Sequence, residues 1–232
     1  MSSDKKIETF IYLGKNKISI SVFSEKDKLI FKKDLLIQKN YLDLDQNTYE
    51  FIEKTILEFE SKYQILLKKM NVIIDKDYFI ETNISIKDKI NNRLITKEDI
   101  EYLIFDLKKV VNDNNSNFFI TNIKIKNFKV DGKNYETFEE IPSGDTLSLE
   151  VTFESIKKDL QIQIKNFLSN LEVDIDKYFS TNYLEQEKFN EKIDECVAAV
   201  RSVYDYDQNE VFLIVKNKEK RGFFEKLFHF FS

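Results

Sequence analysis

Few residues in this chain have the chemical types and spacing that catalysis needs. The single histidine, His229, lies near the C-terminus on the polar side of an aromatic segment, where contact with solvent or lipid headgroups is favoured over catalysis. The single cysteine, Cys196, begins the run Cys-Val-Ala-Ala-Val, whose apolar character predicts a buried structural thiol. We therefore predict no catalytic residue and no enzymatic activity.

Carboxylates are plentiful, but none falls in a recognised metal-binding pattern. The cluster 113–117 (Asp-Asn-Asn-Ser-Asn) has cation-binding groups, yet a loop between a helix and a strand is the favoured interpretation. The segment 205–210 lacks the glycine and the spacing of a calcium loop and is typical of a turn. The sequence therefore predicts no metal site.

Composition excludes further classes of function. The chain has only four glycines, and backbone cradles for phosphate groups need glycine, so a nucleotide-dependent enzyme is disfavoured and no cofactor is expected. From Lys216 onward five Lys/Arg and two Glu give a charge of +3, so with −5 overall the preceding residues carry −8. An acidic body without a basic stripe disfavours nucleic acid as a partner.

The elements that must position any site begin with a strand-rich N-terminal block. Hydrophobic periodicity predicts strands at 7–13, 17–23 and 28–37. A helix capped by Thr48 should then continue to about Lys69, with Leu66 on its apolar face. A further strand is expected at 71–75.

The middle block shows the most regular pattern. Thr96-Lys97-Glu98-Asp99 resembles a capping box and predicts the start of a helix that ends near Asn112. Asp131-Gly132 and Pro142-Ser143-Gly144 are typical turns. The other elements expected in the block are strands at 78–87, 118–130, 134–139, 145–155 and 172–179, and a helix at 156–170.

The C-terminal part consists of a helix expected at 186–203, a strand at 210–215, and a basic linker that leads into an aromatic tail. On a helix, the apolar side chains of the tail occupy one arc of about 160°. A basic, aromatic, amphipathic end is typical of an interfacial membrane anchor; the alternative is a terminal helix that packs on the chain's own core. The expected membrane-binding residues are Lys220, Arg221, Phe223, Phe224, Lys226, Leu227, Phe228, Phe230 and Phe231.

The order of these elements resembles that of the bacterial cell-division protein FtsA, an actin-like protein that tethers FtsZ filaments to the inner membrane. Residues 11–18 (Ile-Tyr-Leu-Gly-Lys-Asn-Lys-Ile) are similar to the opening phosphate hairpin of the actin family. Residues 221–227 (Arg-Gly-Phe-Phe-Glu-Lys-Leu) resemble the membrane-targeting helix. Four segments resemble the FtsA subdomain called 1C: 84–89, 95–100, 129–132 and 173–174.

The chain departs from the actin family where nucleotide would bind. The family's first phosphate loop reads Asp-(Ile/Leu)-Gly-(Ser/Thr), whereas here Tyr12 and Lys15 flank Gly14 and leave a degenerate loop. The nearest match to the second, glycine-rich loop, residues 211–217, has neither aspartate nor glycine. The chain is also too short for the second lobe of the fold, which in FtsA carries the main FtsZ-binding surface.

The resemblance implies an α+β fold consisting of part of the actin first lobe. We expect a 1A-type subdomain at 1–77, a 1C-like subdomain at 78–179 with Leu103, Leu107, Ile164 and Phe167 in one core, and the remaining 1A-like helix and strand at 180–215. The linker and the membrane-targeting helix would occupy 216–232.

The function implied is a non-catalytic division scaffold on the cytoplasmic side of the bacterial inner membrane. Its expected partners are the inner leaflet, other copies of the chain or downstream division proteins. FtsZ is a weaker candidate because the usual binding lobe is absent. No apolar run is long enough to span a bilayer and no signal-peptide core follows Met1, which fits that location. Two alternatives are a pilus-assembly adaptor of the PilM type, which binds a partner's peptide, and an actin-like ATPase.

Overall fold

The computed structural model has a mixed α and β fold with two sheets, each in its own compact unit. Among the described residues, unit 1 comprises those up to Phe79 and those from Asp159 to Tyr204. Unit 2 comprises Ile80–Lys158 and the strand Glu210–Val211. The structure describes residues 7–24, 28–37, 42, 44–186, 193–204 and 210–211.

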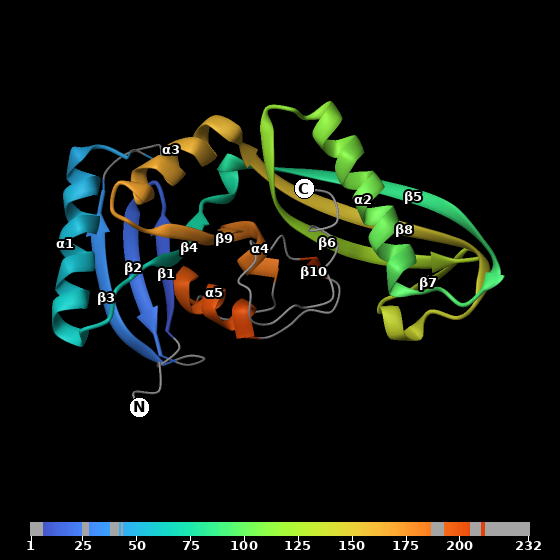
Figure 1. Ribbon diagram of the computed structural model, residues 1–232, viewed down its shortest axis with the longest axis horizontal. Helices are drawn as coiled ribbons and strands as arrows, with labels where there is room; N and C mark the ends of the chain where they lie inside the picture. Colours follow the sequence, from blue (N-terminus) through green and yellow to red (C-terminus); the bar gives the residue numbers. More distant parts are fainter. Residues whose placement is uncertain are drawn as a thin grey trace. The chain divides into compact units, whose positions relative to one another are not determined.

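Unit 1 is built on a five-stranded mixed sheet in the order β3-β2-β1-β4-β9 (Figure 1). The first three strands form an antiparallel meander, and β4 and β9 extend the sheet in parallel with β1. Parallel neighbours need long connections. Here β4 and β9 are joined by residues 80–158 of unit 2 together with α3 (Lys158–Ser169). The strands are β1 (Glu8–Leu13), β2 (Lys17–Phe23), β3 (Leu29–Leu36), β4 (Lys69–Ile74) and β9 (Asp174–Ser180).

Helices cover both faces of this sheet, so its central strands are buried on both sides. All but the first residue of β1 are buried. Phe31 on β3 meets Phe59 on α1 with ring centroids 5.4 Å apart, whereas Phe10 and Tyr12 of β1 share a cluster with Cys196 of α5 on the opposite face. The helices are α1 (Gln46–Tyr63), α3 (Lys158–Ser169), α4 (Thr181–Gln186) and α5 (Glu195–Tyr204), with a short 3-10 helix, η1 (Lys76–Tyr78).

Unit 2 is an antiparallel sheet in the order β10-β6-β8-β5, with the short β7 paired to β6. Between β6 and β7, Asp131 and Gly132 adopt positive φ values of 50° and 83°, which confirms the predicted turn. The elements are β5 (Phe79–Arg93), α2 (Lys97–Asn114), β6 (Phe118–Val130), β7 (Lys133–Tyr135), the 3-10 helix η2 (Phe138–Glu140), β8 (Gly144–Lys157) and β10 (Glu210–Val211).

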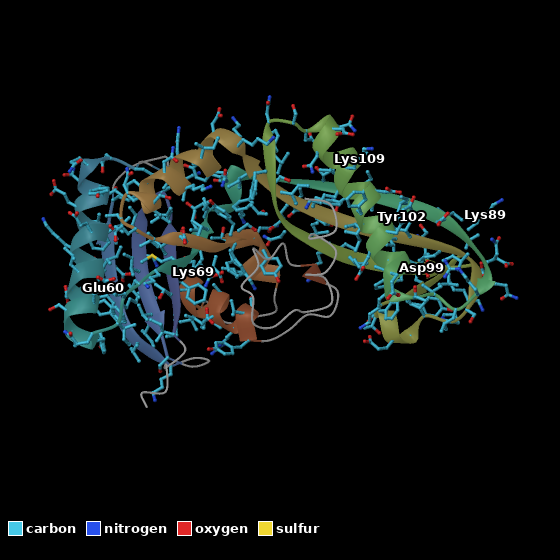
Figure 2. The ribbon with its side chains drawn as sticks, viewed as in Figure 1. Glu60, Lys69, Lys89, Asp99, Tyr102 and Lys109 are labelled. Atoms are coloured by element: carbon cyan, nitrogen blue, oxygen red, sulfur yellow. The ribbon has the colours of Figure 1, made fainter. Side chains whose placement is uncertain are left out.

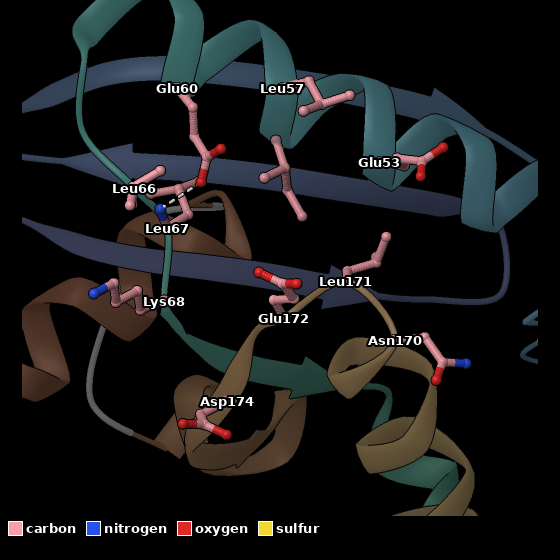
Figure 3. Close-up of a pocket in the computed structure, with 11 residues that line it drawn as sticks. Glu53, Leu57, Glu60, Leu66, Leu67, Lys68, Asn170, Leu171, Glu172 and Asp174 are labelled. Atoms are coloured by element: carbon pink, nitrogen blue, oxygen red, sulfur yellow. Dashed lines mark hydrogen bonds between the residues drawn. The ribbon is translucent and has the colours of Figure 1, made fainter.

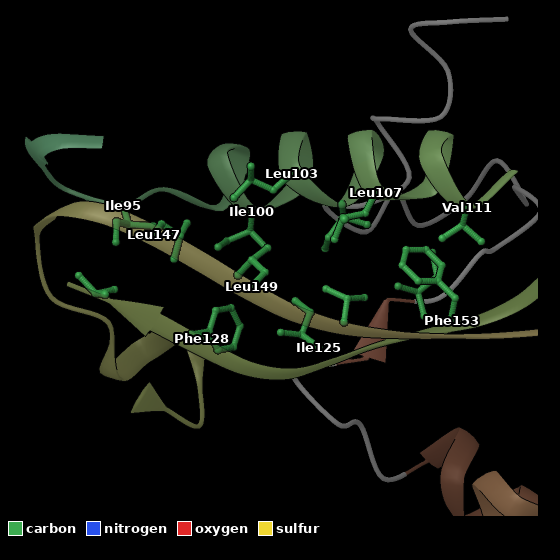
Figure 4. Close-up of a cluster of buried hydrophobic side chains, with 14 of the residues drawn as sticks. Ile95, Ile100, Leu103, Leu107, Val111, Ile125, Phe128, Leu147, Leu149 and Phe153 are labelled. Carbon is green, nitrogen blue, oxygen red and sulfur yellow. The ribbon is translucent and has the colours of Figure 1, made fainter. Parts of the chain in front are cut away.

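The core of unit 2 lies between this sheet and α2 (Figure 4). Leu103, Leu107 and Val111 recur along the buried face of α2 at helical spacing. Alternate residues of the long strands meet them, including Ile125 on β6 and Phe153 on β8. Asp99 lies in the first turn of α2 (Figure 2), where its carboxylate accepts a hydrogen bond of 2.8 Å from the Thr96 backbone N–H. The predicted helix start is confirmed.

The inserted block is shorter than the predicted 78–179. The part of unit 2 that is inserted between β4 and β9 ends at Lys158, and α3 and β9 belong to unit 1 because β9 pairs with β4. Ile164 and Phe167 are therefore buried in unit 1, where the ring of Phe167 lies 5.7 Å from that of Tyr49. Of the four residues expected in one core, only Leu103 and Leu107 share the core of unit 2.

The first predicted helix also ends earlier than the sequence pattern indicates. Instead of continuing to Lys69, α1 ends at Tyr63, where Gln64 adopts a left-handed conformation (φ 56°). Asp45, rather than Thr48, caps this helix by accepting from the Thr48 N–H at 2.8 Å. Leu66, expected on the buried face of the helix, is 65% exposed.

Three further predictions needed correction. The strand expected at 134–139 is the short β7 followed by η2, and the helix expected at 186–203 is represented by α4 and α5. The strand expected at 210–215 is described only at Glu210–Val211, where it pairs with β6 of unit 2 rather than with the sheet of unit 1. The linker and tail, 216–232, lie outside the described residues.

Candidate functional site

The candidate site is the turn between β1 and β2, where the resemblance to the actin family implies a phosphate loop. Tyr12, Gly14 and Lys15 lie here together, at the carboxyl end of β1. The turn is closed by a backbone hydrogen bond of 3.0 Å from Gly14 N–H to the Lys17 carbonyl. Because β1 and β4 are parallel and pair Leu13 with Ile74, the end of β4 lies beside this turn.

Asp75, the first residue after β4, lies beside the turn and accepts two hydrogen bonds from it. Its Oδ1 accepts a 2.6 Å hydrogen bond from the Tyr12 hydroxyl, and its Oδ2 accepts a 2.9 Å bond from the Lys15 backbone N–H. That amide is the kind of donor that would contact a phosphate in a nucleotide-binding loop. In this protein it is already bonded to the chain's own carboxylate.

The side chain of Lys15 is likewise paired within the site. Its Nζ forms an ion pair with Asp77 and lies 5.9 Å from the centre of the Tyr78 ring. The hydrogen bond to Asp77 raises the pKa of Lys15. The 3-10 helix that carries both partners is attached to α4 through a 2.9 Å hydrogen bond from Lys76 N–H to Thr181 Oγ1. The one lysine of the turn is therefore directed to a neighbouring carboxylate.

Tyr12 itself occupies space next to the turn backbone. Its side chain is 8% exposed, and a Cβ atom on Gly14 would lie 2.5 Å from the Tyr12 Cζ, so only glycine fits beside this ring. Burial, followed by the hydrogen bond to Asp75, raises the pKa of Tyr12, which keeps the phenol protonated as a donor. Lys17 Nζ lies 5.2 Å from the centre of the same ring.

A second polar cluster anchors the start of α5 to the sheet. Asp194 accepts from Lys32 Nζ at 2.7 Å and lies 3.5 Å from Lys17 Nζ, and its Oδ1 accepts from the Cys196 N–H at 3.1 Å. Burial alone would raise the pKa of Asp194, but the two lysines lower it on balance. This arrangement keeps α5 against β1, where Tyr12 and Cys196 share one buried cluster.

Sequence reasoning identified Tyr12, Gly14 and Lys15 but missed Asp75, Asp77 and Asp194. Asp75 had a usable signal, since it directly follows an apolar strand, and the carboxyl ends of adjacent parallel strands lie at one edge of a sheet. No local pattern links Asp194 with Lys17 and Lys32, because these residues come from opposite ends of unit 1.

The remaining predictions concern chemistry and membranes. Cys196 is fully buried, and burial raises the pKa of its thiol to about 12. The described residues contain no cluster of His, Cys, Asp and Glu that could bind a metal ion, and none of their helices is long and apolar enough to cross a membrane. His229 and the nine expected membrane-binding residues lie outside the part that the structure describes.

Comparisons with known proteins give distant structural similarity. No family model and no curated protein matches the sequence. A chain of the PilM-PilN type IV pilus biogenesis complex is similar over 79% of this chain and 50% of its own length, with 8% identity and a TM-score of 0.48.

The cytoplasmic domain of EpsL, an inner membrane component of the type II secretion system of Vibrio cholerae, is similar over 75% of this chain and 57% of its own length. The identity is 13% and the TM-score 0.37. This chain therefore spans only 50% and 57% of the lengths of these two structures.

Proposed function

We propose that this chain is a non-catalytic assembly adaptor with a partial actin-like fold, which binds other proteins at the cytoplasmic face of a membrane. The observation that carries the proposal is the occupied turn between β1 and β2. Asp75 accepts hydrogen bonds from the Lys15 N–H and the Tyr12 hydroxyl, and Asp77 forms an ion pair with the Lys15 ammonium group. The groups that would bind a phosphate are therefore already paired within the chain.

The arrangement of the sheet also supports this proposal. Unit 2 interrupts the chain between β4 and β9, which are neighbours in one sheet. An actin-like subdomain with an inserted second unit, as the resemblance implies, requires this connectivity. An adaptor of this kind uses the stable sheet as a platform, and its specificity resides in surfaces rather than in a nucleotide cleft.

The nucleotide part of the proposal is tested by equilibrium binding. A fluorescent ATP analogue with Mg²⁺ is titrated with the full chain, and we expect no saturable binding. A micromolar dissociation constant that is reversed by unlabelled ATP would contradict the proposal.

The proposed function has two versions. In the first, the chain is an adaptor of a pilus or secretion assembly and binds a peptide of a partner. In the second, it is a cell-division scaffold, which the basic, aromatic segment 216–231 favours. Deletion of the gene should abolish pili or secretion in the first case. A tagged chain should gather at midcell in the second, and should lose that position without residues 217–232.

Membrane attachment is tested by vesicle flotation. We expect the full chain to float with anionic vesicles, and Phe224→Glu/Phe228→Glu to remain in solution, because two charges enter the apolar arc. The matched control, Asn217→Glu/His229→Glu, adds the same charge outside the arc and should still float. Equal loss by both double variants would show that charge alone, rather than the aromatic face, governs binding.

A further inference from the structure

Unit 1 has a groove away from the turn described above (Figure 3). One wall is the C-terminal half of α1, the second is the segment 64–68 before β4, and the third is the turn between α3 and β9. Its volume is about 450 Å³, within the range of sites that bind side chains or small ligands.

Apolar side chains at this groove remain exposed to solvent. Leu57 on α1 is 59% exposed and Leu66 is 65% exposed, while Ile56 and Leu67 beside them are buried. Leu66 is exposed because α1 ends at Tyr63. If the helix continued, its spacing would place Leu66 on the buried face, but Leu66 lies instead in the segment that connects α1 to β4. Two exposed leucines beside a hollow form an apolar surface that a binding partner would cover.

The rim of the groove is acidic. Its charged residues are Glu53, Glu60, Glu172, Asp174 and Lys68, so four carboxylates face one ammonium and the net charge is −3. Glu60 accepts from the Leu67 N–H at 2.8 Å. Within the described part of the chain, the carboxylates of Glu53, Glu172 and Asp174 have no hydrogen bond or ion pair. Three carboxylates are therefore available to a cationic partner.

The walls are joined by backbone hydrogen bonds, so the groove exists before any partner binds. Asp174 N–H donates to the Lys68 carbonyl at 2.8 Å, where the parallel pairing of β4 with β9 begins. Glu172 adopts a positive φ of 59° and donates its N–H to the Ser169 carbonyl at 3.0 Å. A preformed surface lowers the cost of ordering on binding.

We propose that this groove binds the basic, aromatic C-terminal segment, residues 216–232, of a second copy of the chain. The segment carries a net charge of +3 and the groove a net charge of −3. The phenylalanines of the segment would pack against the exposed leucines of the groove. The inference rests on the proposed function as an assembly protein and deepens it. A segment bound in the groove is withheld from the membrane, so self-assembly and membrane attachment compete for the same residues.

The test uses the full chain with photoreactive benzoylphenylalanine in place of Phe228. After irradiation, we expect a covalent dimer whose linked peptides contain residues 53–68 or 170–174. Glu172→Lys should lower the dimer yield at least about fivefold, because it places a cation on the acidic rim. Leu66→Ser should also lower it, and this exposed position leaves folding intact. Asp113→Lys, the same charge change on α2 of unit 2, should leave the yield unchanged.

Three results would overturn the inference: links mainly to other surfaces, links to the groove only within monomers, or yields that Glu172→Lys and Leu66→Ser do not change. Thermal melts of each variant identify loss of folding. The vesicle and nucleotide experiments are independent of this measurement. Failure of the groove alone would therefore leave the proposed function standing, whereas saturable ATP binding would contradict that function whatever the crosslinks show.

Discussion

Tyr12 illustrates how one side chain decides whether a turn is open to ligands. Its ring lies against Gly14, and its hydroxyl bonds to Asp75, which also accepts from the Lys15 amide. An aspartate at this position, as in the actin family, would place two carboxylates together and leave the turn less crowded. The tyrosine instead converts the turn into a structural contact between β1 and β4.

We predict that Tyr12→Phe destabilises the protein by about 1.5–3 kcal/mol, because it removes a hydrogen bond to a carboxylate in a largely buried place. Chemical denaturation measures the change. Tyr102→Phe is the control, since Tyr102 is 61% exposed on α2 and its hydroxyl has no hydrogen bond to described residues. A loss no larger than that of the control would mean that the Asp75 contact contributes little to folding.

A second prediction at this scale concerns Cys196. Its thiol is fully buried, and its pKa is raised to about 12, so the reactive thiolate is almost absent at neutral pH. We expect a disulfide reagent such as dithionitrobenzoate to label the native protein very slowly and the denatured protein at once. Rapid labelling under native conditions would show that α5 opens readily from the sheet.

At the scale of single elements, α2 shows how local signals specify a helix. The Arg93 guanidinium donates to Asp99 at 2.6 Å, and this bond, with those from Thr96, lowers the pKa of Asp99 to about 2. The folded-state pKa lies below the unfolded value of about 3.9. The charged carboxylate therefore stabilises the fold above that value, and the contribution is lost as the pH falls toward 2.

We predict that Asp99→Asn lowers stability at pH 7 by about 0.5–2 kcal/mol, the usual range for a helix cap. The difference between wild type and variant should shrink between pH 4 and pH 2, where the wild-type carboxylate becomes protonated. Urea denaturation at several pH values measures it. Asp113→Asn, in the last turn of the same helix, should change stability by less than about 0.5 kcal/mol. A pH-independent difference for Asp99→Asn would contradict the assignment.

At the scale of the whole molecule, the chain is two compact units with separate cores. Leu107 is buried between α2 and the sheet of unit 2, and Ile164 is buried on α3 of unit 1. The chain leaves unit 1 after β4 and returns to it at α3, so the two cores are formed from interleaved parts of the sequence.

We predict that Leu107→Ala and Ile164→Ala each destabilise their own unit by about 2–5 kcal/mol through loss of buried methyl groups. Hydrogen exchange by mass spectrometry locates the effect. Leu107→Ala should accelerate exchange in 80–158, and Ile164→Ala in 7–79 and 159–204. Equal acceleration throughout the chain in both variants would show that the units unfold as one.

The sequence by itself determined those features that depend on neighbouring residues. The strand at 17–23, the helical spacing in α2, the Thr96–Asp99 start and the Asp131–Gly132 turn are all local, and the structure confirms each of them. The departures from the phosphate-loop motif at Tyr12 and Lys15 could also be recognised from the sequence, because a motif is defined by consecutive residues.

Only the tertiary structure decided which distant residues meet. Asp75 and Tyr12 are 63 positions apart, and their bond depends on the parallel pairing of β1 with β4. The assignment of α3 to unit 1 follows from the pairing of β9 with β4, although its own amphipathic pattern suits either core. Leu66 is exposed because the chain must leave α1 at Gln64 to reach β4. Periodicity reports which face of an element is apolar, whereas strand pairing selects the surface that buries it.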